Sequence, residues 1–174
     1  NASISPYDVD IGGLLVYYLS NQTDAELNFN IFARTTGYYD FTVVDYNATP
    51  TDRDYIPRNY SVRINMGSNY IEEYDLQPYL ISNIDGIIPK IKVIDQLNRS
   101  VNNAIILVYK YIDGAYTVVE SGITDSTGAI SWAAYPLDSY TIAVYYQEEL
   151  KGNYVIRPRT SDDVYWIQID LGED

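Results

Sequence analysis

Apolar and polar residues alternate along much of the chain, and this period restricts it to β-strands. The segments 27–33, 62–66, 140–146 and 165–171 follow the pattern. Successive side chains of a strand point to opposite faces of a sheet, so the period is typical of strands with one buried face. The 20 tyrosines among 174 residues add to this preference, because aromatic residues are enriched in strands. The sequence therefore predicts an all-β fold.

Short clusters of Gly, Asn, Asp and Ser separate the strand-like segments. The pair Asp113-Gly114 and the run 125–128 contain residues that tolerate positive φ or hydrogen-bond their own backbone. Such residues are typical of the tight connections between neighbouring antiparallel strands. Both places are predicted to be chain reversals.

The strand pattern is interrupted near the midpoint of the chain. Residues 83–86 are turn-like, Pro89 follows them, and strand spacing resumes on both sides. We predict two tandem antiparallel β-sandwich domains of the immunoglobulin or transthyretin type, over residues 1–86 and 87–174. Domains this small bury a low fraction of their surface, so the halves are expected to pack on each other or on neighbouring subunits.

The composition removes several classes of function. The chain has no Cys and no His, so it lacks thiol nucleophiles, disulfides, the usual transition-metal ligands and the commonest general base. Its 24 acidic and 11 basic residues give a net charge of −13, which repels phosphate backbones. No apolar run approaches the roughly 18 residues of a membrane helix. We predict a non-enzymatic protein with no catalytic residue, cofactor or metal site, no nucleic-acid partner and no membrane span.

Acidic residues cluster at four places and offer the oxygen ligands that Ca²⁺ prefers. None of the clusters has the spacing of an EF-hand loop, and acids in separate turns do not indicate the cleft of a glycoside hydrolase. We interpret them as solvated turn carboxylates that keep a β protein soluble and discourage pairing at sheet edges. The clusters are Asp8 with Asp10, Asp52 with Asp54, Glu72 and Glu73 with Asp75, and Asp162 with Asp163.

Four motifs follow one another in the second half of the chain. They are a strand ending in Asp, an Asn-Ala entry to the next strand, a Thr-Asp-x-x-Gly turn and a Leu-x-x-Tyr hairpin, within 91–95, 101–109, 121–132 and 135–144. In this order they resemble the transthyretin-like, or carboxypeptidase-regulatory-like, β-sandwich domains, which include the B-type repeats of bacterial surface adhesins. The resemblance covers about residues 87–171 and implies a stalk, spacer or accessory module.

The resemblance has one departure and carries over no site residue. Ser139 precedes the Tyr of the last motif, where the family usually has Gly. Some adhesin repeats contain an internal Lys-to-Asn isopeptide bond beside a buried acid, but Lys90 and Lys92 alternate with apolar residues and are predicted to face outward. Glu120 lies near a predicted strand end, and we interpret it as a solvated carboxylate. We therefore predict no isopeptide bond.

Asn-X-Ser/Thr triplets indicate an extracellular chain. The sequence starts without Met, which fits removal of a leader, and each triplet needs an exposed turn to accept a glycan. Chance occurrence in a chain rich in Asn, Ser and Thr is the alternative. The candidate glycosylation sites are Asn21, Asn47, Asn59 and Asn98, with a further triplet at Asn1.

One apolar segment does not alternate and is predicted to be buried on both faces. It follows Gly12-Gly13 and consists of Leu14, Leu15, Val16, Tyr17, Tyr18 and Leu19. One interpretation is a central strand of the first domain. The other is an assembly strand donated to a neighbouring subunit, because strand addition is an established route to polymers.

These observations lead to one main functional hypothesis and two alternatives. The main hypothesis is a glycosylated extracellular structural protein, a subunit of a cell-surface filament, pilus-like thread or layer that assembles through β-strands and Tyr-rich interfaces. A virion protein such as a turret, spike or tail component is the first alternative. The second is a carbohydrate-binding accessory module of a secreted enzyme, with exposed aromatic residues such as Tyr145 and Trp166 stacking on sugars.

Overall fold

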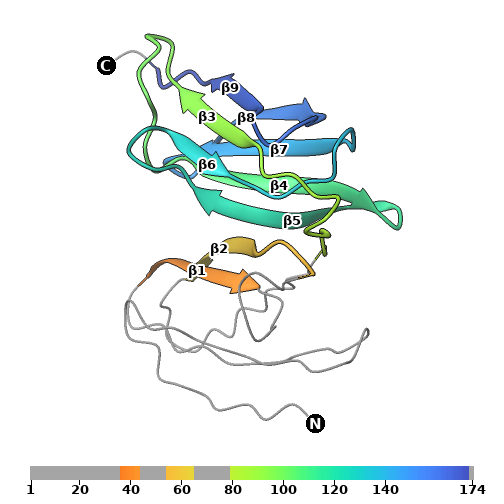
Figure 1. Cartoon of the computed structure of the whole chain (residues 1–174). Helices are drawn as coiled ribbons and strands as arrows, with labels where there is room; N and C mark the ends of the chain where they lie inside the picture. Colours follow the sequence, from red (N-terminus) through yellow and green to blue (C-terminus); the bar gives the residue numbers. More distant parts are fainter. Residues whose placement is uncertain (1–35, 44–53, 65–78, 173–174) are drawn as a thin grey trace. The chain divides into compact units, whose positions relative to one another are not determined.

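The computed structural model describes residues 36–43, 54–64 and 79–172, which form strands and turns without an α-helix (Figure 1). The all-β prediction is confirmed. The strands are β1 (Gly37–Val43), β2 (Arg58–Ile64), β3 (Lys90–Ile94), β4 (Ile105–Ile112), β5 (Ala115–Ile123), β6 (Ala129–Ser131), β7 (Tyr140–Tyr146), β8 (Glu149–Ile156) and β9 (Val164–Gln168).

The chain divides into two compact units. The first consists of residues 1–39 and 63–73, and the second of residues 40–62 and 74–174. Most described residues belong to the second unit. The domain boundary at residue 86 and a sandwich over residues 1–86 stay predictions.

The second unit contains a two-layer β-sandwich (Figure 1). One layer has the strand order β6-β3-β9 and the other the order β5-β4-β7-β8, while β1 and β2 pair separately. All pairs in the four-stranded layer are antiparallel. The pair β3–β9 is parallel, which departs from the antiparallel sheets expected from the sequence.

The hydrophobic core lies between the two layers. Both layers contribute branched aliphatic side chains, each of which stabilises the fold by about 1.5–3 kcal/mol when fully buried. Trp132 meets Tyr140 edge to face, with ring centroids 4.9 Å apart. Gly122 on β5 lies so close to Ile130 on β6 that a Cβ atom at position 122 would require the terminal methyl of Ile130 to move. The main core residues are Ile91, Val93, Ile106, Val108, Val119, Ile142, Val144, Ile156, Ile167 and Ile169.

Both predicted chain reversals are confirmed. Asp113 and Gly114 connect β4 to β5 with φ angles of 49° and 90°, the left-handed region that Asp and Gly tolerate. The carboxylate of Asp125 accepts hydrogen bonds from the backbone and hydroxyl of Thr127, and Gly128 has a φ of 74°. Local side-chain chemistry therefore determines both turns.

The alternating segments in β7 and β9 face as predicted. In β7 and β9 the apolar side chains that share one face point toward the core, and Trp166 is 59% exposed on the other face. In β2, Ser61 is buried as well as Val62, which departs from the alternation expected around 62–66, and residues 65–66 lie outside the described residues. Tyr145, which we expected to be exposed, is half-buried. The segment 27–33 lies outside the described residues. Within the part that the structure describes, no helix has the length and apolar character to cross a membrane.

Candidate assembly surface

One side of the sandwich ends in two strand edges, those of β8 and β9. Each strand is the last of its sheet, and no described strand pairs with its outer edge. The hydroxyl of Tyr154 on β8 donates to the carbonyl of Gln168 on β9 at 3.2 Å, so the two edges lie on the same side. Unpaired edges expose N–H and C=O groups that can bind a further strand. We call this the open side.

Apolar side chains are exposed on both strands of the open side. Val155 on β8 is 71% exposed, and Leu150 on the same strand and Val164 and Trp166 on β9 are exposed as well. Single exposed apolar residues are ordinary, but here they accompany two unpaired edges. The combination is typical of a surface that another polypeptide covers.

Strand β2 contacts β5, at the edge of the four-stranded layer opposite β8, through side chains. The backbone N–H of Ser61 donates to the hydroxyl of Ser121 at 2.7 Å, and the guanidinium of Arg58 donates to the carbonyl of Val119 at 3.0 Å. These bonds cross between strands that do not belong to one backbone ladder. The edge of β5 is therefore contacted within the chain.

Arg58 and Glu120 form a buried ion pair at this contact. Their side chains are 1% and 3% exposed, and the guanidinium Nη1 lies 3.3 Å from the carboxylate Oε2. Arg58 also donates to the carbonyl of Ala133 at 2.6 Å, and the N–H of Ala133 donates to Glu120 at 2.8 Å. Two segments of the sandwich and β2 are thus joined through one pair of charges.

The burial of Glu120 corrects its interpretation as a solvated carboxylate. Burial raises its pKa to about 7, although Arg58 and the backbone amides of Ala133 and Asn59 favour the charged form. The sequence does not reveal the β-bulge at this place. The register between β4 and β5 shifts beside Val108, which pairs with Glu120. A bulge redirects side chains, and alternation alone does not locate it.

Four cations near β9 have no salt bridge among the described residues, whereas Arg58, Arg99, Lys110 and Lys151 each have one. They are Lys90, Lys92, Arg157 and Arg159, and we call them the free cations.

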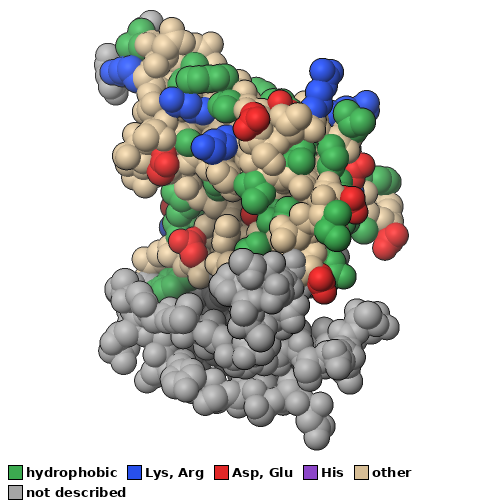
Figure 2. Space-filling view, viewed as in Figure 1, with side chains coloured by type: hydrophobic (Ala, Val, Ile, Leu, Met, Phe, Trp, Pro, Cys, Tyr) green, Lys and Arg blue, Asp and Glu red, His purple; other side chains and the backbone are tan. Residues whose placement is uncertain are grey.

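The β3 register places two of the free cations beside β9. Lys90 pairs with Val164 and Lys92 with Trp166, and both Lys side chains face away from the core, as predicted. The ammonium of Lys92 lies 4.6 Å from the centroid of the Trp166 ring, a cation–π distance. Figure 2 shows Lys and Arg side chains over the part of this face that carries β3 and β9.

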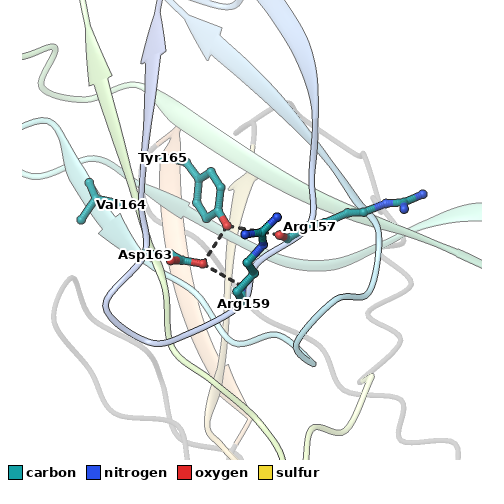
Figure 3. A pocket seen from close by; sticks show the side chains of 5 residues that line it. All are labelled: Arg157, Arg159, Asp163, Val164 and Tyr165. Atoms are coloured by element: carbon teal, nitrogen blue, oxygen red, sulfur yellow. Dashed lines mark hydrogen bonds between the residues drawn. The ribbon is translucent and has the colours of Figure 1, made fainter.

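The other two free cations line a pocket of about 330 Å³ at the start of β9, together with Asp163, Val164 and Tyr165 (Figure 3). The carboxylate of Asp163 accepts bonds from the backbone N–H of Arg159 at 2.7 Å and from the hydroxyl of Tyr165 at 2.9 Å. Such bonds hold the pKa of Asp163 below its usual value.

The guanidinium groups of this pocket are not engaged by that carboxylate. In Figure 3 the side chain of Arg157 extends away from Asp163, and Arg159 contacts Asp163 through its backbone. Asp163 therefore fixes the turn, while both guanidinium groups stay available to an anionic partner. A cluster of Lys and Arg side chains that form no salt bridge with a described residue is unusual in a chain whose net charge is −13.

The structure locates some of the residues that the sequence singles out. Asn98 lies on an exposed turn with a φ of 61°, as a glycan acceptor requires. Asn59 lies within β2 instead of a turn, and its side-chain amide oxygen Oδ1 accepts a hydrogen bond from the hydroxyl of Thr42 at 2.9 Å. The described residues contain no group of three or more acidic side chains arranged to hold a metal ion. Asn1, Asn21, Asn47 and the assembly strand 14–19 lie outside the described residues.

Comparisons with known proteins give no family. No protein-family model and no curated protein matches the chain.

Three solved structures resemble the chain at low identity. A streptococcal ancillary pilin is 13% identical, with a TM-score of 0.36 over 75% of this chain and 44% of that chain. The Bacillus anthracis TIE protein is 14% identical, with a TM-score of 0.38 over 76% of this chain and 24% of that chain. A 9R-lipoxygenase from Cyanothece PCC8801 is 12% identical, with a TM-score of 0.33 over 59% of this chain and 18% of that chain. The chain spans less than half the length of each, and TM-scores this low carry no argument about function.

Proposed function

We propose that this protein is a non-enzymatic extracellular building block whose copies join through β-strands into a cell-surface filament, pilus-like thread or layer. The observation that supports this function is the open side of the sandwich. There two strand edges lie side by side with exposed apolar residues and no described partner strand. A strand from a neighbouring subunit would satisfy the backbone groups and cover the apolar side chains together.

The two sides of the sandwich differ in whether another segment of the chain contacts their edge strands, and this difference favours strand addition at one of them. On one side, β2 contacts the edge of β5 through Ser61 and Arg58. On the other side, no described strand pairs with the outer edge of β8 or β9, and the two strands contact each other through Tyr154 and Gln168. A subunit that accepts a strand at this side and donates one to its neighbour is joined head to tail. Head-to-tail contacts of this kind extend into filaments when the rotation between subunits does not close a ring.

The experiment is to image the full-length protein by negative stain and to repeat the measurement without residues 1–19. The full chain is expected to form filaments or sheets, and the truncated chain is expected to stay soluble and folded. A synthetic peptide of residues 1–19, added to the truncated chain, should bind it and raise its melting temperature. A full-length chain that remains monomeric under all conditions tested contradicts the proposal.

A carbohydrate-binding accessory module is the second candidate, because Trp166 is exposed and flanked by Lys92. Sugar rings stack on exposed indole rings, and a cation beside the ring selects acidic sugars. Quenching of Trp fluorescence by soluble uronate oligosaccharides, together with a lack of self-assembly, would favour this candidate. A virion protein would assemble through the same strand contacts as a cell-surface subunit. Capsid genes beside the gene for this chain would favour that alternative.

A further inference from the structure

We infer that the outer edge of β9 is the acceptor for a second copy of this chain, whose acidic segment 8–19 pairs with it in the parallel direction. The inference rests on the proposed function and adds to it the acceptor strand, the direction of pairing and the charges that select it. The occupant is the segment 8–19 of a neighbouring copy of the chain.

The two edges of the open side differ in how well they accept a strand. Strand β8 carries Glu149 and Lys151, joined by a salt bridge of 2.6 Å, and its pairing with β7 shifts register beside Val144. Charges and bulges at an edge are the features that prevent pairing. Strand β9 has the sequence Val-Tyr-Trp-Ile-Gln without a charge, and its register with β3 is continuous over five residues. The edge of β9 is therefore the accepting one.

The surroundings of the β9 edge are apolar on both faces of the sheet. Trp166 and Val164 are exposed on the outer face, and Tyr165 on the inner face packs partly against the core. A strand added here would lie beside apolar side chains on both of its faces. Residues 14–19 are apolar at every position, so they match this requirement, whereas an alternating strand would place a polar row against one face.

The free cations select the direction of pairing. Parallel pairing that sets Leu14 beside Val164 brings Asp10 and Asp8 toward the start of β9, where Arg157 and Arg159 line the pocket. Lys90, opposite Val164, adds a third positive charge.

Antiparallel pairing would bring the same aspartates toward the other end of β9. There Asp170 follows β9, so acidic residues would face one another. Like charges across an interface suppress the wrong arrangement, and opposite charges increase the association rate. Because each subunit carries a net charge of −13, the free cations offset part of the repulsion between subunits at this one place.

The first test is a charge swap in the full-length chain. Arg157→Glu with Arg159→Glu should slow assembly by about tenfold or more at low salt, and Asp8→Lys with Asp10→Lys in the same chain should restore it. Neither Arg side chain forms a salt bridge with a described residue, so the fold, checked by circular dichroism and melting temperature, should be retained.

The matched control lowers the net charge by the same four units through Asn102→Asp, Ala115→Glu, Tyr116→Glu and Ser126→Glu, which are exposed positions outside β8 and β9. It should assemble at nearly the normal rate after correction for ionic strength. If the control slows assembly as much as the Arg157/Arg159 variant does, or if the swap does not restore assembly, the acceptor assignment is wrong. Loss of assembly on deleting 1–19, with no effect of the charge reversal, would overturn this inference and leave the proposed function intact.

The second test measures direction by disulfide formation, which is unambiguous because the chain has no Cys. Leu14→Cys with Val164→Cys should give disulfide-linked ladders of subunits on oxidation, because facing residues of adjacent strands lie about 4.8 Å apart, within the Cα range of a disulfide. Leu19→Cys with Val164→Cys should not. A ladder from the second pair establishes antiparallel pairing, and no ladder from either pair contradicts pairing at β9; each result overturns the inference.

Discussion

The buried ion pair between Arg58 and Glu120 allows a test of how β2 is attached to the sandwich. The perturbation is Arg58→Met, which keeps the unbranched apolar stem of the side chain but removes the guanidinium. Arg58 is 1% exposed, and its nitrogens donate to the carbonyls of Val119 and Ala133 and lie 3.3 Å from the Glu120 carboxylate. The substitution therefore leaves two buried carbonyls and a buried carboxylate without that donor.

The expected cost follows from these contacts. Removing one partner of a buried ion pair typically costs about 3–5 kcal/mol, because the other charge stays buried without compensation. For a chain of this length, each kcal/mol lowers the melting temperature by about 2–4 °C, so the total decrease is about 6–20 °C. The decrease should be smaller at pH 5 than at pH 8, since a protonated Glu120 no longer needs a cation.

The assay is urea unfolding followed by circular dichroism at both pH values. The matched control is the double variant Arg58→Met with Glu120→Leu, which removes both charges and should recover at least half of the lost stability. Hydrogen exchange at Ser61, whose N–H is bonded to Ser121, reports the attachment of β2 directly. If Arg58→Met costs less than about 1 kcal/mol, or if the double variant is no better than the single one, the ion pair does not hold β2 in place.

Three further predictions concern other parts of the second unit. The pKa of Glu120 is raised to about 7 from an ordinary 4.5, so between these pH values the folded state keeps a proton that the unfolded state releases. The stability that this group contributes is full below pH 4.5 and decreases by about 3 kcal/mol as the pH rises through 7. Glu120→Gln should therefore make the unfolding free energy nearly independent of pH between 5 and 8. Gly122→Val should destabilise the fold by about 1–3 kcal/mol by overpacking against Ile130, and Ile130→Ala in the same chain should restore part of this in chemical unfolding; equal stability of both variants and the wild type would contradict the close approach. Peptide mass spectrometry of material from the native source should find a glycan on Asn98 at higher occupancy than on Asn59, because only Asn98 lies on an exposed turn, and a bare Asn98 would contradict the prediction.

Local signals in the sequence predicted the parts of the fold that depend on neighbouring residues. Alternation identified which face of β7 and β9 is buried, because each side chain's direction follows from its position in the strand. Asp113-Gly114 identified a hairpin, since the turn needs residues that accept positive φ. Both signals act within a few residues, and packing did not override them.

Features that depend on distant residues were not predictable in the same way. The parallel register of β3 and β9 joins segments far apart in the sequence, and nothing in either strand specifies the other. The same is true of Arg58 and Glu120, whose pairing depends on the bulge in β5. The free cations are scattered in the sequence and gather only through the β3–β9 register, so the candidate assembly surface could not be recognised before the topology was known.

The parallel pair β3–β9 has a mechanical consequence for the proposed thread-forming role. The two strands run in the same direction, β3 near the start of the sandwich and β9 near its end, with five residue pairs in register. Tension that pulls the chain before β3 and after β9 in opposite directions would slide one strand along the other. All backbone bonds between them would then carry the load together, instead of opening one after another from an end. Under tension, the simultaneous rupture of this short ladder would determine the rate of forced unfolding of the subunit.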